Sequence, residues 1–208
     1  MNPDAYRFYS KIYDKVYEPA AKRLRFMGIK IFPPQENLAV LDVGCGTGTQ
    51  LALYQKAGCK LYGIDLSPSM LAAARQKLGD SADLRLEDAS KMSFAAATFD
   101  LVTIVLALHE MPAGLRCEIL EECRRVVKPD GRMMLMDYHF GPHPFPMGWV
   151  WKAMVVMMEM SAGRQHYANY RDFISRRGLQ GLVGDLGLRV DKCFVTESGV
   201  AAIYLLKP

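Results

Sequence analysis

Apolar runs alternate with helix-like stretches between residues 37 and 138. Strands and helices in alternation predict βαβ units, in which parallel strands build one sheet. Residues 99–111, FDLVTIVLALHEM, are too continuously apolar for a strand with one solvated face, so we expect a central position in the sheet. The expected strands lie within residues 38–45, 59–66, 84–90, 99–111 and 132–138.

Local signals mark where the helices begin and end. Ser67 and Pro68 suit the N-cap and the first position of a helix that Gly79 ends. A later helix begins at Pro112, and the segment Lys-Pro-Asp-Gly at 128–131 predicts a turn before the fifth strand.

The regular alternation stops after residue 138. Residues 147–163 predict a helix of unusual apolarity, and residues 167–187 predict one further amphipathic helix. Two β runs, 189–198 and 200–208, predict a closing hairpin. Before the first strand, one face of a predicted helix carries Tyr6, Tyr9, Tyr13 and Tyr17.

Composition and charge narrow the class of protein. Half of the 208 residues are hydrophobic and the formal net charge is +4, as in an ordinary globular domain. No long Lys/Arg run occurs, so nucleic acid is not an expected partner. The five cysteines show no CxxC spacing, so we expect reduced thiols and no metal site. A polar N-terminus and the lack of a membrane-spanning apolar run predict a cytoplasmic location.

The most informative segment is LDVGCGTGTQ, residues 41–50. Its glycines follow the first strand, where glycine permits a sharp turn and a close approach of a ligand to the backbone. Ligands of doubly wound sheets bind beyond the carboxyl ends of the strands, so this loop borders the expected site. Asp65, at the end of the second strand, can accept hydrogen bonds from ribose hydroxyls. The loop and the acid predict a nucleoside-binding site, with the spacing G-x-G-x-G in place of the dinucleotide fingerprint G-x-G-x-x-G.

These residues resemble the class I S-adenosylmethionine-dependent methyltransferases, specifically the ubiquinone/menaquinone methyltransferase-like (type 11) group. The resemblance covers about residues 37–138 and includes, in order, LDVGCGTG, the acid of GIDLS, the acid of LEDAS, FDLV with LHEM, and RRVVKPDGR. The family usually has KPGG where this chain has Lys-Pro-Asp-Gly. The resemblance implies an α/β fold: a doubly wound, mostly parallel, seven-stranded Rossmann-like sheet with an antiparallel C-terminal hairpin.

The resemblance also implies roles around bound S-adenosylmethionine, whose product is S-adenosylhomocysteine. The glycines lie under the methionine part, and Asp42 orients its amino group. Asp65 takes the ribose hydroxyls, and Asp88 meets the adenine amino edge. The implied cofactor-binding residues are Asp42, Gly44, Cys45, Gly46, Gly48, Asp65, Leu66, Met70, Asp88, Ala89, Val105 and Leu106.

We expect one methyltransferase domain over residues 1–208, in four parts. An N-terminal helical lid spans 1–34 and a cofactor-binding core spans 35–138. A substrate-lid insertion spans 139–167, and the C-terminal helix and hairpin span 168–208.

His109, in the LHEM segment, is the candidate catalytic residue. The sulfonium already activates the methyl group, so a general base is needed only when the acceptor must lose a proton. The alternative is a hydrogen-bonded histidine at a helix entry. For His139 and His143, loop packing is the alternative to a role at the site.

Residues outside the core are expected to select the acceptor. The candidates are Tyr9 and Tyr13 of the N-terminal face, His139, and Trp149 in the apolar segment 149–160. Methionines in that segment adapt to irregular apolar surfaces, so it predicts a lid over a hydrophobic substrate. A homodimer interface, plain core and a transient membrane contact are the alternatives.

The sequence therefore predicts a methyltransferase that acts on a small, hydrophobic acceptor, such as a quinone precursor or a lipid, by in-line displacement. The alternatives are a catalytically idle S-adenosylmethionine-binding module and an NAD-dependent oxidoreductase, which the glycine spacing disfavours.

Overall fold

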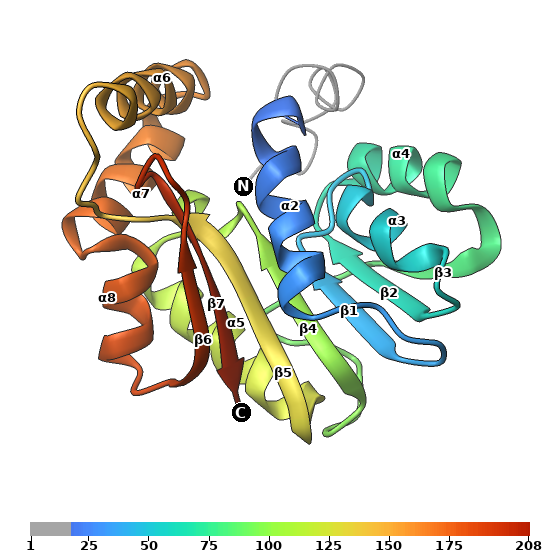
Figure 1. The fold of residues 1–208 in the computed structure, drawn as a ribbon. Helices are drawn as coiled ribbons and strands as arrows, with labels where there is room; N and C mark the ends of the chain where they lie inside the picture. Colours follow the sequence, from blue (N-terminus) through green and yellow to red (C-terminus); the bar gives the residue numbers. More distant parts are fainter. Residues whose placement is uncertain (1–17) are drawn as a thin grey trace.

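The fold is built on one mixed sheet of seven strands (Figure 1). The computed structural model describes residues 18–208. The strand order is β3-β2-β1-β4-β5-β7-β6, and only the pairs that involve β7 are antiparallel. This confirms the predicted fold class. The strands are β1 (Ala39–Val43), β2 (Lys60–Asp65), β3 (Ala82–Leu86), β4 (Phe99–Val105), β5 (Val127–Tyr138), β6 (Arg189–Val195) and β7 (Ala201–Lys207).

Helices cover both faces of the sheet and leave its carboxyl edge to loops and α6 (Figure 1). Helices α2 (Glu18–Ile31), α3 (Thr49–Gln55) and α4 (Pro68–Leu78) pack on one face. Helices α5 (Ala113–Val126), α7 (Arg164–Ser175) and α8 (Gly178–Asp185) pack on the other. Helix α6 (Met147–Ser161) and the short 3₁₀ turns η1 (Gly79–Ser81) and η2 (Leu108–Glu110) complete the described elements.

Alternate residues of the central strands feed two separate hydrophobic cores. In β1, Leu41 and Val43 face the core under α5, α7 and α8, while Val40 faces the core under α2, α3 and α4. The side chains of β4 are almost all buried, which confirms its predicted central position. Within residues 18–208, no helix has both the length and the apolarity needed to cross a bilayer.

Predicted helix ends are confirmed around α4. The Ser67 side chain accepts a hydrogen bond from the Met70 amide, Pro68 takes the first position, and Gly79 is the C-cap. The predicted hairpin is also confirmed, with β6 and β7 antiparallel.

Two predictions of secondary structure were wrong. The Lys-Pro-Asp-Gly segment at 128–131 lies inside β5 and forms an irregularity in its pairing with β4, where the register shifts between Phe99 and Leu101. The single helix expected over 167–187 is two helices. Arg177 and Gly178 both adopt positive φ, of 67° and 56°, so the chain turns between α7 and α8.

Arg116 joins the segment after β4 to helix α7. It is 2% exposed, its guanidinium donates to the carbonyls of Leu108 and Asn169, and it pairs with Asp172 at 2.8 Å. Two backbone carbonyls that belong to different elements therefore depend on one buried side chain.

We expect Arg116→Met to lower the free energy of unfolding by about 1–3 kcal/mol, because the Leu108 and Asn169 carbonyls lose their donor. Urea unfolding measures the change. Arg124→Met, on the exposed side of α5, is the matched control, since its pair with Glu121 lies at the surface and is worth below about 1 kcal/mol. Equal losses in the two variants would contradict the role of Arg116.

Candidate functional site

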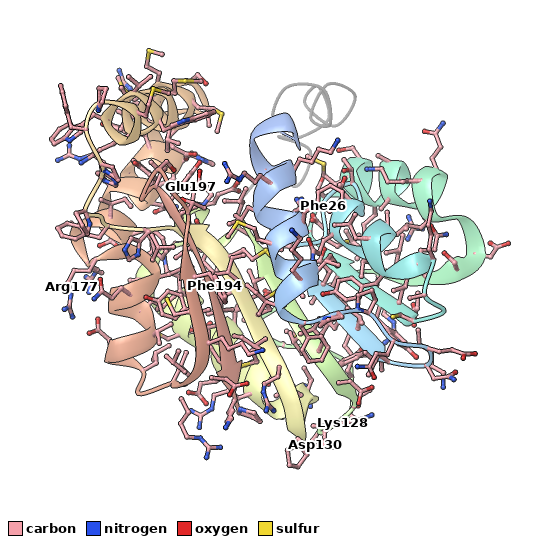
Figure 2. The ribbon with its side chains drawn as sticks, viewed as in Figure 1. Phe26, Lys128, Asp130, Arg177, Phe194 and Glu197 are labelled. Carbon is pink, nitrogen blue, oxygen red and sulfur yellow. The ribbon has the colours of Figure 1, made fainter. Side chains whose placement is uncertain are left out.

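A cavity of about 1420 Å³ lies beyond the carboxyl ends of the parallel strands. Loops after β1, β2, β3 and β4 form its floor, and α2, α6 and the tip of the β6–β7 hairpin contribute to its walls. An ion pair of 2.6 Å joins Arg23 of α2 to Glu197 at the hairpin tip, which faces α2 (Figure 2). Ligands of doubly wound sheets bind at this edge.

The glycines of the loop after β1 divide into two roles. Gly44 and Gly46 line the cavity with φ of 67° and 52°, and a Cβ built on Gly46 would meet no atom within 4 Å. The backbone there is left-handed and bare toward the cavity, as a closely approaching ligand requires. Gly48 lies outside the cavity lining, and a Cβ there would come within 2.8 Å of Leu78. The lack of a side chain at Gly48 therefore lets the start of α3 pack closely against α4.

Asp65 ties the end of β2 to the glycine loop. Its carboxylate accepts hydrogen bonds of 2.8 Å from the amides of Gly46 and Ser67. Burial raises the pKa of Asp65, although these backbone hydrogen bonds oppose the shift. The carboxylate lines the cavity and is fixed in direction by the loop, so it offers its remaining lone pairs to a ligand.

Asp42 lies below the loop instead of on the cavity wall. It is 2% exposed and accepts a 2.6 Å hydrogen bond from the Thr103 hydroxyl of β4. Burial raises the pKa of Asp42 to about 6, against the hydrogen bond from Thr103 and the charge of Arg25. Arg25 is itself buried and lines the cavity.

The other predicted cofactor residues line the same end of the cavity. Asp88 is exposed, and its Oδ1 accepts hydrogen bonds from the amide and hydroxyl of Ser90. Leu106 has a φ of 52°, a strained value for leucine that typifies functional sites. The predicted residues found in the lining are Gly44, Cys45, Gly46, Asp65, Leu66, Met70, Asp88, Ala89, Val105 and Leu106.

An apolar wall faces these residues from the segment after β4, from α5 and from α6. It consists of Met111, Leu115, Ile119, Met147, Trp151, Val155 and Met158. Of the predicted lid residues, Trp149 is 56% exposed beneath the Lys152 ammonium and lies outside this lining. His139 is buried and lines a separate, much smaller pocket with His143. Tyr9 and Tyr13 lie outside the described residues.

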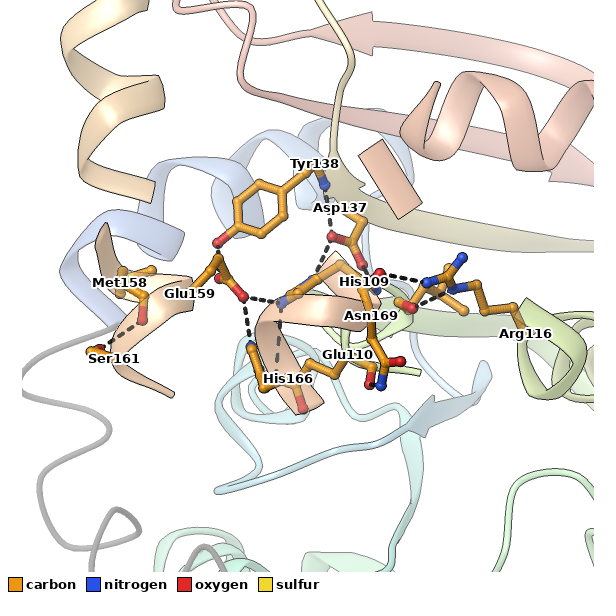
Figure 3. A network of polar contacts seen from close by, with 11 residues as sticks. His109, Glu110, Arg116, Asp137, Tyr138, Met158, Glu159, Ser161, His166 and Asn169 are labelled. Carbon is orange, nitrogen blue, oxygen red and sulfur yellow. Dashed lines mark hydrogen bonds and ion pairs between the residues drawn. The ribbon is translucent and has the colours of Figure 1, made fainter. Parts of the chain in front are cut away.

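A buried polar cluster completes the wall at His109 (Figure 3). His109 Nδ1 lies 2.7 Å from Asp137 Oδ1, and because a carboxylate only accepts, Nδ1 carries the hydrogen. Nε2 of the same ring lies 3.5 Å from Glu159 Oε2. That oxygen also lies 2.6 Å from His166 Nε2, and the Tyr138 hydroxyl donates to Glu159 Oε1 at 2.8 Å.

The charges of this cluster stabilise one another. Burial lowers the pKa of His109, but the carboxylates of Asp137, Glu159 and Glu110 outweigh it and raise the pKa to about 9. For Glu159, burial acts upward, while the His166 hydrogen bond and the His109 charge hold its pKa below the usual value.

Sequence reasoning singled out His109 and missed its partners. Asp137 ends β5, Glu159 is the only acid of the apolar helix α6, and His166 lies on α7. A lone carboxylate in an apolar helix is a usable signal, because such a group is rarely buried without a partner. The partner itself is set by how α6 and α7 pack, and no local pattern specifies that.

Comparisons with known proteins agree with this geometry. Residues 41–135 match the family described as Methyltransferase domain. The chain is 28% identical to demethylmenaquinone methyltransferase of Bacillus subtilis (strain 168), over 96% of this chain and 92% of that protein. The chain is an S-adenosylmethionine-dependent methyltransferase. It is also 27% identical to ubiquinone biosynthesis O-methyltransferase of Xanthomonas axonopodis pv. citri, over 81% of this chain and 69% of that protein.

Solved structures share the fold of this methyltransferase. A SAM-dependent methyltransferase from Aquifex aeolicus superimposes with a TM-score of 0.64 at 22% identity, over 99% of this chain and 98% of that one. The cofactor of the methyltransferase is S-adenosylmethionine, and the glycine loop and acids described above lie in the part of the chain that matches the family.

We expect the affinity for S-adenosylhomocysteine to fall as the pH drops through 6. We propose that Asp42 orients the cofactor's ammonium; binding then favours the ionised carboxylate, so below the pKa of about 6 a proton must first leave this carboxyl. Titration calorimetry between pH 5 and 8 measures the trend, with circular dichroism to verify folding. Asp42→Asn removes the titrating group and should flatten the profile. A flat profile in the unmodified protein would contradict the assignment.

Proposed function

We propose that this methyltransferase transfers a methyl group to a hydrophobic acceptor, a quinone precursor or a similar lipid-like molecule. The observation that carries the proposal is the apolar wall defined above, which lines the same cavity as the glycine loop. Apolar side chains stabilise an acceptor by removing its apolar surface from water. The names of the two quinone-related methyltransferases similar to this chain support the same substrate class.

Transfer proceeds by in-line displacement. The sulfonium methyl already carries a good leaving group, so the protein must chiefly align the acceptor atom behind it. Holding two reactants in attack geometry supplies up to about 7–11 kcal/mol. The glycine loop and Asp65 hold the adenosyl and methionine parts, Asp88 with the Ala89 backbone holds adenine, and the apolar wall holds the acceptor.

His109 is the side chain that acts on the acceptor. Asp137 fixes its Nδ1, so Nε2 is the nitrogen directed toward the cavity side of the cluster. Asp137 is thus a positioning residue for His109, and the interaction orients the ring as a carboxylate orients histidine in other enzymes.

His109→Ala and Asp65→Ala should affect different kinetic quantities. With demethylmenaquinol as the acceptor, His109→Ala should lower kcat by roughly 100-fold or more, the contribution of a well-positioned catalytic group. Asp65→Ala should instead weaken S-adenosylhomocysteine binding by about 10–100-fold, because hydrogen bonds to a charged group are lost. Stopped-time assays and calorimetry measure the two effects. An unchanged kcat in His109→Ala would remove His109 from the chemistry.

The outer face of α6 favours access to a membrane-held acceptor. Its exposed side chains include Trp149, Met154, Met157 and Met160, and its only acid, Glu159, points inward. Lys152 is therefore the only charged residue left on the outer face of this helix. Exposed apolar side chains of a helix can enter the acyl boundary of a bilayer.

The double variant Met157→Glu, Met160→Glu should raise KM for demethylmenaquinol held in phosphatidylglycerol vesicles. Neither side chain lines the cavity, so kinetics with a short-chain, water-dispersed naphthoquinol should stay unchanged. Val190→Glu, an exposed apolar position on β6, is the matched control. Equal flotation of all variants with vesicles would argue against membrane access through α6.

A further inference from the structure

Three separate elements bring metal-ligating atoms together at the edge of the cavity. His109 comes from η2, Glu159 from α6 and His166 from α7, and each offers one ligand atom within 4.8 Å of the other two. Among the described residues this is the one group of histidine, cysteine and acidic side chains with such geometry. All three side chains line the cavity wall.

The separations suit one ion between the three atoms. A zinc ion binds histidine nitrogen and carboxylate oxygen at about 2.0–2.2 Å, so two ligands of one ion lie at most about 4.2 Å apart. Glu159 Oε2 lies 3.5 Å from His109 Nε2 and 2.6 Å from His166 Nε2. The 2.6 Å separation is that of a hydrogen bond, so an ion would replace this bond and move the two atoms apart. Two histidines and one carboxylate form a set that leaves further coordination positions open.

The surroundings of the ligands are those of a built metal site. Asp137 accepts from His109 Nδ1 and so directs Nε2 outward, which is the usual partner arrangement of a metal-bound histidine. The Tyr138 hydroxyl donates a 2.8 Å hydrogen bond to the second oxygen of Glu159, Oε1 (Figure 3). The atoms of His109 and Glu159 that would not bind the ion, Nδ1 and Oε1, are therefore each held by a hydrogen bond to another buried group.

An ion would satisfy the charge balance of the cluster as well as protons do. The carboxylates of Asp137 and Glu159 are almost fully buried, at 0% and 4% side-chain exposure. Buried carboxylates require compensating positive charge. One divalent ion supplies as much charge as the protons on both imidazoles, which it would replace.

The geometry points to a zinc-class divalent transition ion bound by His109, Glu159 and His166, with an open position toward the acceptor end of the cavity. There the ion would polarise an acceptor oxygen as a Lewis acid, so that His109 would act on the acceptor as a ligand of the ion and not as a base. Only this last role rests on the proposed function. The binding site itself rests on the three ligands and their partners.

Metal binding is tested without any acceptor. The full chain in a Cys193→Ser background, which removes an exposed thiol, is stripped with chelator and titrated with Zn²⁺ by calorimetry. We expect stoichiometric binding, and with Co²⁺ a visible spectrum of nitrogen and oxygen ligation that lacks a thiolate charge-transfer band. His166→Ala and Glu159→Gln should abolish this binding, and Asp137→Asn should weaken it by about 10–100-fold.

His143→Ala is the matched control, because it removes one imidazole near the same lid without touching the cluster. It should bind Zn²⁺ as the parent does. S-adenosylhomocysteine binding verifies that every variant is folded. Two results would overturn the inference: no stoichiometric Zn²⁺ binding in a parent that still binds S-adenosylhomocysteine, or binding that survives both His166→Ala and Glu159→Gln. Failure of methyl transfer to demethylmenaquinol, with zinc bound as expected, would count against the proposed acceptor and not against the site.

Discussion

The burial of one carboxylate, that of Glu159, is the constraint on which the acceptor end depends. A carboxylate removed from water costs several kcal/mol unless charge and hydrogen bonds compensate it. Compensation comes from His109 on η2, His166 on α7 and Tyr138 at the end of β5. Helix α6 is therefore held over the sheet edge by a polar cluster that reaches into three other elements.

The two ends of the cavity follow different physical rules. At the cofactor end, backbone conformation matters most: bare, left-handed glycines and a carboxylate that binds their amides. These features depend on residues close to the strand ends, so the sheet topology places them with little freedom. At the other end, the apolar wall comes from the segment after β4, from α5 and from α6, and the polar cluster joins η2, β5, α6 and α7. The sheet fixes the first end, and the packing of α6 and α7 decides the second.

This difference explains what could be predicted from the sequence. The alternating runs of residues 37–138 predict the parallel strands because burial on both faces leaves a local signature, and Ser67 with Pro68 marks a helix start by hydrogen bonding that is local too. Gly48 shows the limit of that reasoning. It carries the expected left-handed backbone but packs against Leu78, and only the tertiary structure separates that role from ligand contact.

Predictions failed where long-range contacts decide the outcome. Residues 128–131 were predicted as a turn, yet the flanking residues Val127 and Arg132 both pair with β4, and Lys128 contacts Asp100 at 2.7 Å, so the segment stays within β5. The burial of Arg25 has no local signature either, because it depends on α2 packing beside α3, where Arg25 donates to Gln50. Glu159 and His109 are 50 residues apart in the sequence, and no repeating pattern of residues marks them as partners.

The position of α6 rests more on this cluster than on apolar packing. Met154, Met157 and Met160 of that helix remain about half exposed or more, and apolar groups that stay in water contribute no burial energy. Val155 and Met158 do face the cavity, so their burial is completed only when the cavity is filled. An apolar ligand in the cavity would therefore add packing energy to α6, whose position the polar cluster already fixes. Helix α6 can thus be loosely packed along most of its length and still be fixed in position where Glu159 contacts His109.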